Sequence, residues 1–411
     1  MKNNTILANS LQLANGTMIK NRFYKAAMSE NFAPKDHNPT QSLVTLYETW
    51  ANGGAGLLVT GNVMIDRKAI GESGNVVIED EANLDMLKQW AKAGTKNETH
   101  LWMQLNHPGK QSPKALSSQP VAPSAIPLTG NLKNFFNSPR ALKHEEIQDI
   151  IKRFGNAARI AKKAGFTGVQ IHAAHGYLIN QFLSPHHNQR TDTWGGSIDN
   201  RMKFLVEIYF EIRKQVGKEF PIGLKLNSAD FQRGGFTEEE SMLVIQKMSE
   251  IGVDLIEISG GNYENPKMFV ENSNERTKKR EAYFLDYADK ARKLISTPLV
   301  VTGGFRSEEG MIEAISSGAI DMVGIGKAFA LVPDLPNQIF QGRYKTVQIK
   351  PIQTGVKWVD SKAAMLEVGW YEQQLERMSK GKCPNPNYSV WLSLIKYYME
   401  NGVSAFQKRR A

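Results

Sequence analysis

The sequence predicts a (β/α)8 barrel, an α/β fold in which eight parallel strands alternate with helices. Short apolar runs rich in β-branched residues alternate with amphipathic segments from about Arg22 to about residue 340. Eight such units in tandem are typical of a closed barrel rather than of a doubly wound sheet. A dinucleotide-binding sheet is also disfavoured, because no Gly-x-Gly-x-x-Gly follows an early strand and opens a helix.

The expected strands follow one another at regular intervals along the chain. They are Phe23–Met28, Leu57–Thr60, His100–Leu105, Gly168–Ala173, Pro221–Asn227, Asp254–Ser259, Leu299–Gly303 and Asp321–Gly326. Between them, Glu145–Ala164 and Arg201–Val216 carry apolar residues at helical spacing. Thr237 and Ser307 each precede acidic residues, which predicts two helix N-caps.

Two regions do not fit a plain strand–helix unit. The stretch Pro108–Pro139 is long and rich in Pro, Ser and Asn, and we expect it to rise above the barrel. The tail from about Gln348 is too aromatic to be disordered, with Trp358, Trp370 and Trp391 among its residues. We therefore divide the chain into a barrel over residues 1–345 and a helical extension over residues 346–411 that packs on it.

Composition excludes several classes of protein. The 411 residues are 41% hydrophobic and 22% charged, as in soluble globular proteins, and no apolar run is long enough for a membrane helix. The single cysteine, Cys383, excludes an internal disulfide, a cysteine-based zinc site and an iron–sulfur cluster. The net charge of +10 is spread among acidic residues, so we expect no nucleic-acid partner. With no secretory signal, we expect a cytoplasmic protein; its association into homo-oligomers stays open.

In a barrel, the active site lies at the carboxyl ends of the strands, so the residues there form an inventory of candidates. The inventory comprises Ala27, Met28, Ser29, Asn62, Gln104, His172, His175, Tyr177, Lys225, Gly303, Gly304, Gly326 and Lys327. Gly303-Gly304 and Gly326-Lys327 follow the last two strands, where barrels often bind phosphate. Glycine lets backbone N–H groups approach an anion, and lysine adds a charge.

His172 and His175 leave three alternatives open: metal ligands, a structural pair, or two N–H donors aimed at a carbonyl oxygen. They converge only if the chain turns after Ala173. We favour the donors and expect no metal, because the inventoried strand ends offer no third, carboxylate ligand. Tyr177 adds a hydroxyl that can donate a proton. His186 and His187 are expected to be ordinary exposed loop residues. Donors and a phosphate anchor without a nucleophile–base pair indicate a phosphate-bearing cofactor or substrate.

These motifs resemble the old yellow enzyme family of FMN-dependent NADH:flavin oxidoreductases. The resemblance runs from about Leu11 to about residue 340 and rests on "GVQIHAAHGYLINQFLSP", "WGGS", "QLNHPGKQ", "TGGF" and "GIGKAF" in order. It implies a ping-pong reaction. NADH or NADPH reduces FMN, which passes a hydride to the β-carbon of an α,β-unsaturated carbonyl or similar activated alkene.

The resemblance also implies a role for each site residue. His172 and His175 hold the substrate carbonyl, and Tyr177 protonates its α-carbon. Lys225 lies by the flavin N1, and the Ser29 hydroxyl by the C4 carbonyl. Gln104 meets the pyrimidine edge, Ala27, Met28 and Asn62 line the flavin face, and Gly303, Gly304, Gly326 and Lys327 hold the phosphate.

The chain departs from the family pattern in four places. Ala27 replaces a common proline, Ser29 replaces threonine or cysteine, and Lys225 and Lys327 replace arginines, which loses the planar bidentate fork. Two other functions therefore stay open: a flavin-binding protein with little turnover, and a metal-dependent barrel hydrolase that uses the histidine pair.

Overall fold

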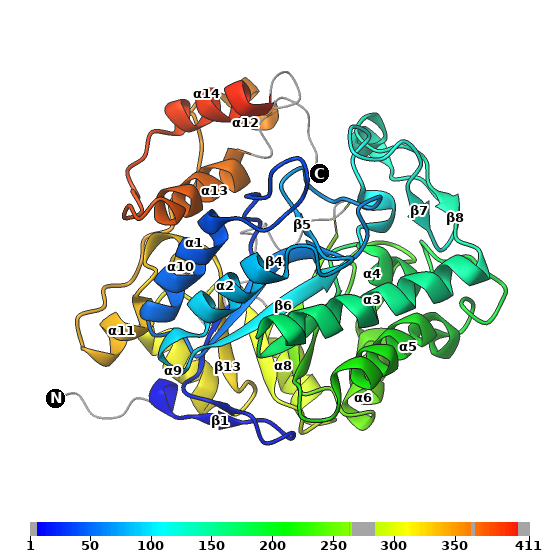
Figure 1. The fold of residues 1–411 in the computed structure, drawn as a ribbon, viewed down its shortest axis with the longest axis horizontal. Helices are drawn as coiled ribbons and strands as arrows, with labels where there is room; N and C mark the ends of the chain where they lie inside the picture. The colour runs from blue at the N-terminus through cyan, green and yellow to red at the C-terminus, as the bar shows by residue number, and fades with distance from the viewer. Residues whose placement is uncertain (1–5, 263, 265–283, 363–365, 402–411) are drawn as a thin grey trace.

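The computed structural model describes residues 6–262, 264, 284–362 and 366–401. Eight parallel strands of these residues close on themselves, because the first barrel strand pairs with both the last and the second. Seen in Figure 1, helices surround this barrel. The barrel strands are β3 (Phe23–Lys25), β4 (Leu57–Met64), β6 (His100–Asn106), β9 (Gly168–Ala173), β10 (Ile222–Asn227), β11 (Leu255–Ser259), β12 (Leu299–Thr302) and β13 (Met322–Ile325). The predicted (β/α)8 barrel is confirmed.

The helices that follow the strands place an apolar face against the barrel. They are α1 (Gln41–Asn52), α2 (Leu84–Gly94), α3 (His144–Ala164), α4 (Leu178–Leu183), α5 (Ile198–Val216), α6 (Glu238–Glu250), α8 (Leu285–Arg292), α9 (Glu308–Ser316), α10 (Lys327–Leu331) and α11 (Leu335–Phe340). Thr237 accepts a hydrogen bond from the Glu240 amide and Ser307 from the Gly310 amide, so both predicted N-caps are confirmed. α5 begins before the predicted Arg201 because Ser197 caps it.

Short strands and 3-10 helices complete the chain outside the barrel. They are η1 (Ile6–Ala8), β1 (Leu11–Gln12), β2 (Met18–Ile19), β5 (Val76–Val77), η2 (Lys96–Glu98), η3 (Gly109–Gln111), β7 (Val121–Ala122), η4 (Gly130–Asn134) and β8 (Arg140–Ala141). The last four form the excursion over residues 108–139 and the strand that follows it. Leu128, Leu132 and Phe136 of the excursion pack with Tyr177, so the excursion covers the end of β9.

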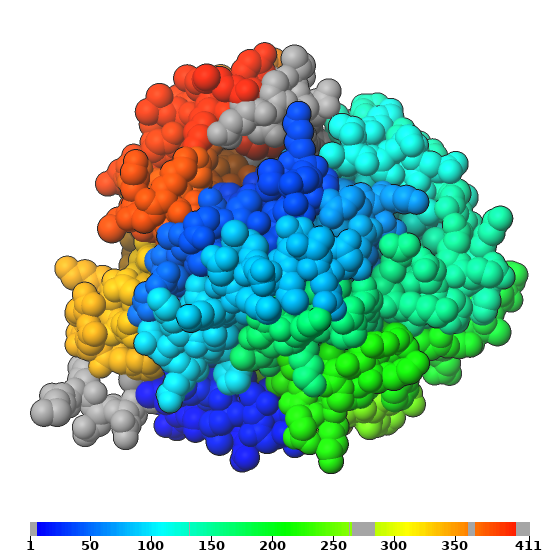
Figure 2. All heavy atoms as spheres, in the orientation of Figure 1, coloured from blue at the N-terminus to red at the C-terminus, as the bar shows by residue number. Residues whose placement is uncertain are grey.

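The chain after the barrel forms α12 (Lys357–Lys362), α13 (Leu366–Ser379) and α14 (Val390–Asn401). α13 contacts α1 and α10, and Figure 2 shows the orange and red extension packed against the blue surface of the N-terminal segment. Residues 402–411 of the predicted extension lie outside the described residues. None of the helices described is long and apolar enough to cross a membrane.

Trp102 fills the lower barrel interior and is fully buried. It packs in an apolar cluster that includes Tyr24, Val59 and Leu255. Two neighbouring strands make room for its indole with glycine. A Cβ built on Gly168 would lie 2.5 Å from the Trp102 Nε1, and one on Gly223 would lie 2.7 Å from its Cζ3. The absence of side chains at these two positions is therefore a packing requirement.

We predict that Gly168→Ala lowers the free energy of unfolding by about 1–3 kcal/mol, because the methyl group overpacks a rigid ring. Urea unfolding measures the change. In a Trp102→Phe background the same substitution should cost less than half as much, since the smaller ring leaves room. An equal penalty in both backgrounds would contradict this explanation.

Candidate active site

A cavity lies at the carboxyl ends of the barrel strands and collects nearly all the predicted site residues. Those that line it are Ala27, Met28, Ser29, Asn62, Gln104, His172, His175, Tyr177, Lys225, Gly303, Gly326 and Lys327. Gly304 is not among the lining residues, although it follows Gly303 directly and shares its left-handed backbone. Eight strand ends meet here because all the strands run in one direction around the barrel.

His172 and His175 converge because the chain turns sharply after β9. His175 has φ of +61° and Gly176 of +75°, a conformation that glycine adopts freely and histidine only at a cost. Two asparagine side chains hold the turn. Asn227 Oδ1 accepts a hydrogen bond from the backbone N–H of His175, and Asn180 Oδ1 accepts one from the backbone N–H of Gly176. The His172 and His175 ring centroids lie 5.1 Å apart, edge to face.

His172 presents a neutral imidazole to the cavity. Its Nδ1 accepts a hydrogen bond from the Ala174 amide at 3.2 Å, which places the proton of the neutral ring on Nε2. Burial, and then the nearby charge of Lys225, hold the pKa of His172 well below its usual range. The ring is therefore an N–H donor that carries no charge near neutral pH. His175 is fixed differently, because its Nε2 lies 2.7 Å from the Ser259 hydroxyl.

Tyr177 completes this side of the cavity. Its ring lies 4.9 Å from that of His172, and the side chain is buried beneath the excursion. Asn62 Nδ2 donates to the Tyr177 hydroxyl at 3.4 Å. The other end of the same amide, Asn62 Oδ1, is buried without a hydrogen-bond partner among the described residues. An orphaned acceptor of this kind indicates a ligand that donates a hydrogen bond.

Lys225 lies beside His172 on the neighbouring strand and is paired from below. Its Nζ donates to Glu257 Oε1 at 3.0 Å, with both side chains buried. Burial opposes the charge on Glu257, but Lys225 and hydrogen bonds from Thr302 and Tyr24 lower the pKa of the carboxyl. The sequence inventory missed Glu257 because it lies inside β11 and not at its end. A single acidic residue in the apolar run Leu255-Ile-Glu-Ile was the signal.

Gln104 is tied into the same buried network. Its Nε2 donates to Gln170 Oε1 at 2.7 Å, and Gln170 Nε2 donates in turn to the Tyr24 hydroxyl and to Glu257 Oε2. The floor of the cavity is therefore a continuous set of hydrogen bonds between β3, β6, β9 and β11. Such a network holds the Gln104 amide in one orientation toward the cavity.

The C-terminal extension supplies carboxylates that sequence reasoning did not place. Lys327 Nζ lies 2.6 Å from Glu367 of α13. The Ser29 hydroxyl lies 2.8 Å from Glu372 of the same helix and 2.7 Å from Glu72, which belongs to the barrel and precedes β5. One hydroxyl has a single proton to donate, so it bonds one of these two carboxylates at a time. Glu367, Val368 and Tyr371 line the cavity, so α13 forms one of its walls.

The prediction that His187 is an exposed loop residue is wrong. Its side chain is 2% exposed, whereas His186 is half-buried. The physical reason is the excursion, which brings Lys110 to within 2.9 Å of His187 Nδ1 and covers the loop. Among the described residues, the group of ligating side chains that could hold a metal ion is His186, His187 and Glu264, and neither His172 nor His175 belongs to it.

Comparison with known proteins assigns this site to a class. The sequence model of the NADH:flavin oxidoreductase / NADH oxidase family matches residues 7–346. The chain is 37% identical to the NADH-dependent flavin oxidoreductase iliE of Hypocrea jecorina over 348 residues, which cover 79% of this chain and 86% of that protein.

Solved structures agree with this assignment. A 2-naphthoyl-CoA reductase superposes with a TM-score of 0.75 at 29% identity, covering 82% of this chain but only 52% of that one. The old yellow enzyme homologue of Zymomonas mobilis gives a TM-score of 0.70 at 26% identity, covering 84% and 94%. The chain belongs to the NADH:flavin oxidoreductase / NADH oxidase family. It is a flavin oxidoreductase with FMN as its cofactor and a reduced nicotinamide as its electron donor.

The cavity fits a flavin by the chemistry of its lining. The orphaned Asn62 Oδ1 offers an acceptor, and Lys225 and Gln104 offer polar groups held from beneath. At the other end, a Cβ on Gly326 would meet only the Met28 side chain, at 3.9 Å, so the backbone there is open to a ligand. A planar, hydrogen-bonding ring system with an anionic tail is the kind of group that these residues suit.

We predict that the protein loses stability as the pH falls below about 6.5, and that His172 carries part of this loss. The unfolded histidine takes up a proton near its ordinary pKa of about 6.5, whereas the folded one, with its lowered pKa, does not. The stability is present above pH 6.5 and declines by up to ~1.4 kcal/mol per pH unit below it.

Urea unfolding of the FMN-free chain at pH 7 and pH 5 measures this effect. In His172→Asn the free energy of unfolding should fall less between pH 7 and pH 5, by up to ~2 kcal/mol. This figure is the slope of ~1.4 kcal/mol per pH unit over the roughly 1.5 units between pH 6.5 and pH 5. Parallel pH profiles for the wild-type protein and the variant would show that His172 is not the group concerned.

Proposed function

We propose that this flavin oxidoreductase is an ene-reductase that acts on α,β-unsaturated carbonyl compounds and similar activated alkenes. The supporting observation is the grouping of His172, His175 and Tyr177 on one side of the cavity, with ring centroids about 5 Å apart. Bound FMN would supply the chemistry of hydride transfer, with NADH or NADPH as the source. The protein residues then have to hold the carbonyl, supply a proton and exclude water.

The histidine pair would polarise the substrate. His172 offers Nε2–H from a ring that stays neutral, so it donates a hydrogen bond to the carbonyl oxygen without protonating it. As negative charge develops on that oxygen, a fixed donor in a buried site stabilises it more than water would. Ser259 holds the His175 ring close by for the second contact. No protein nucleophile is needed for this chemistry.

Tyr177 would supply the proton for the α-carbon. A phenol is a weak acid, so the proton leaves only when a carbanion-like centre develops beside it. The Asn62 amide donates to the phenol oxygen and would stabilise the tyrosinate that remains. Leu128, Leu132 and Phe136 pack against the Tyr177 side chain, which is 2% exposed. The excursion would therefore protect the proton donor as well as shape the substrate site.

The phosphate of the cofactor would be held at the ends of β12 and β13. Gly303 and Gly304 have positive φ angles that glycine adopts freely, the backbone at Gly326 is open to a ligand, and Lys327 adds a positive charge. Lys225 would stabilise negative charge on the flavin ring. Both lysines already have carboxylate partners, Glu367 and Glu257. Glu367, the partner of Lys327, is more exposed than Glu257, the partner of Lys225. A bound phosphate would therefore displace Glu367 more easily than Glu257.

Stopped-flow kinetics of the holoenzyme without oxygen tests the proposal. NADH or NADPH should bleach the flavin absorbance, and 2-cyclohexenone should restore it. Tyr177→Phe should slow the second step by about 10²-fold or more, the usual contribution of a general acid, and change the first by less than about threefold.

Tyr371→Phe is the matched control, because it removes the hydroxyl of another tyrosine that lines the cavity and should change neither step by more than about threefold. A wild-type flavin that is reduced but never reoxidised by enones would refute ene-reduction. Equal slowing of both steps in Tyr177→Phe would refute the proton-donor role.

We predict further that Glu367→Gln tightens FMN binding by up to about fivefold, because the exposed ion pair with Lys327 competes with the phosphate by up to ~1 kcal/mol. Quenching of flavin fluorescence on titration of the apoprotein measures the affinity. Glu376→Gln, on the same helix but paired with Lys380 and Lys396, should leave it unchanged. Equal affinities in wild type and Glu367→Gln would place the phosphate elsewhere.

A further inference from the structure

A buried carboxylate lies next to the turn that carries His175. Asp230 follows β10, is fully buried and is not among the residues that line the flavin cavity. Its Oδ1 accepts hydrogen bonds from Asn180 Nδ2 at 3.1 Å and from Asn227 Nδ2 at 3.2 Å. Its Oδ2 accepts one from the backbone N–H of Phe236 at 3.2 Å. Asp230 therefore joins α4, the end of β10 and the segment before α6.

The surroundings of Asp230 favour its ionised form. Each of these three contacts presents an N–H group to the carboxylate, and a protonated carboxyl would turn its own O–H toward one of these donors. Burial raises the pKa of Asp230, whereas the hydrogen bonds donated by Phe236, Asn227 and Asn180 act against that shift. A buried charge whose donors are all in place is costly to disturb, because a donor left without its acceptor is not solvated by water.

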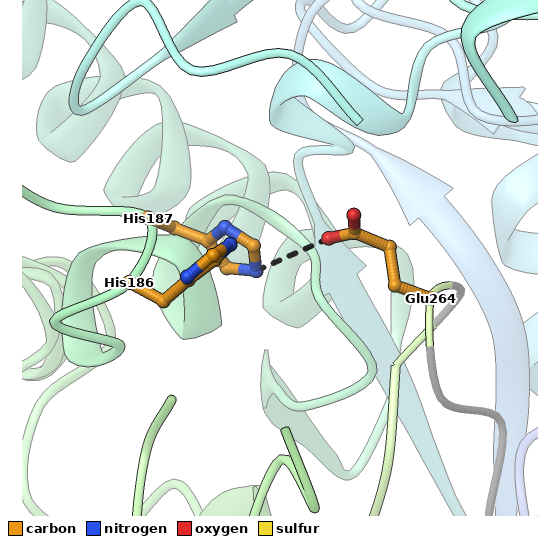
Figure 3. Close-up of side chains that lie close together, drawn as sticks. All are labelled: His186, His187 and Glu264. Atoms are coloured by element: carbon orange, nitrogen blue, oxygen red, sulfur yellow. Dashed lines mark ion pairs between the residues drawn. The ribbon is translucent and has the colours of Figure 1, made fainter. Parts of the chain in front are cut away.

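A buried cation accompanies this negative charge. Lys110 is 2% exposed; burial lowers its pKa to about 8, and the charges of Glu264 and Asp230 act against that shift. The ammonium donates to His187 Nδ1 at 2.9 Å. Nε2 of the same ring faces the Glu264 carboxylate at 3.7 Å (Figure 3). Asp230 therefore carries its charge in a region that also holds a compensating positive charge.

The charge on Asp230 decides which way two asparagine side chains point. A carboxamide has a donor end and an acceptor end, and it turns the donor end toward a carboxylate. Asn180 and Asn227 therefore direct their Oδ1 atoms away from Asp230. Those oxygens accept from the backbone N–H of Gly176 at 2.7 Å and from that of His175 at 3.2 Å. Through the two amides, Asp230 supplies the turn after β9 with its acceptors.

The turn needs this support because its backbone is strained. His175 has a φ of +61°, in the left-handed region that a residue with a Cβ rarely adopts. The Ser259 hydroxyl lies 2.7 Å from the imidazole, and the His175 carbonyl accepts from Gln111 Nε2 at 3.0 Å. Without the two acceptors the backbone would relax toward an ordinary conformation, and the imidazole would move away from His172.

We propose that Asp230 is a positioning residue for the reaction, which holds His175 at the substrate carbonyl by fixing the orientation of Asn180 and Asn227. This role rests on the ene-reductase function proposed above, because that function gives His175 its contact with the substrate. Asp230 acts through the two asparagines and not from within the cavity. What the turn requires is a side chain that only accepts hydrogen bonds, so one of the same shape with a donor end should fail at this position.

Asp230→Asn in the holoenzyme tests the proposal, because it keeps the shape of the side chain and adds a donor. Whichever way the new amide turns, its NH2 group meets either the two asparagines or the Phe236 N–H. In the oxygen-free stopped-flow experiment, reoxidation of the flavin by 2-cyclohexenone should slow by about tenfold or more, since a small misplacement of a contacting group is costly. Reduction of the flavin by NADH or NADPH should change by less than about threefold.

Exchange of the two partners, Asn180→Asp combined with Asp230→Asn, is the rescue. The amide at position 230 then donates to the carboxylate at position 180, which still accepts from the Gly176 N–H, and Phe236 keeps an acceptor. Reoxidation should return to within about threefold of wild type, because each donor again meets an acceptor. Where Asp230→Asn fails to fold, the exchange variant decides alone: slow reoxidation by the folded exchange variant would overturn the proposal.

Asp254→Asn is the matched control for loss of stability. Asp254 is also buried and accepts from the Ile222 N–H and from Arg213, but it precedes β11 at the end of the barrel opposite the cavity. Its replacement should lower the melting temperature and leave reoxidation within about threefold of wild type. If Asp254→Asn slows reoxidation as much as Asp230→Asn does, the effect is a general loss of stability and the positioning role is refuted.

Hydrogen exchange gives a measurement that does not depend on the substrate. The backbone N–H groups of His175 and Gly176 should exchange at least about fivefold faster in Asp230→Asn, the equivalent of one weakened hydrogen bond, and at the wild-type rate in the exchange variant. Unchanged exchange in Asp230→Asn would overturn the positioning role whatever the substrate is. A wild-type flavin that enones never reoxidise would instead refute ene-reduction, so the two failures are distinguishable.

Discussion

The carboxylate of Glu257 joins the strands that carry the active site. It is buried in the barrel interior and receives hydrogen bonds from Tyr24 on β3, Gln170 on β9, Lys225 on β10 and Thr302 on β12. Together with its own strand β11, it connects five of the eight strands. A buried charge with a full set of donors adds little net stability over an apolar core, but removing one partner is costly. The network therefore favours one arrangement of the strand ends, and the cavity above depends on that arrangement.

The same network lies between the packed base of the barrel and the cavity at its carboxyl end. Below Glu257, Trp102 fills the interior and requires glycine at 168 and 223. Above it, Lys225 and Gln104 reach the cavity with their outer atoms already committed to partners. The charged groups at the floor are thus paired before any ligand binds. The Glu367 and Glu372 contacts in the upper wall, which come from α13, are more exposed than those of the floor.

The excursion also joins elements that are distant in the sequence, but it does so above the barrel. Its apolar residues cover Tyr177, and its polar residues reach His187 and Glu264. It therefore connects Tyr177 to the loop before α5 and to the segment after β11.

The sequence by itself determined the barrel, its strand ends and the strand-end residues that line the cavity. It could do so because parallel strands closed into a barrel bring all their carboxyl ends to one face, so that order along the chain gives position in space. His172, Lys225 and Gly326 were found in this way. Three features were decided only by the tertiary structure: Glu257 inside a strand, α13 as a wall of the cavity, and the burial of His187 against Glu264. Each depends on contacts between segments far apart in sequence, and no local period or spacing records which such segments will meet.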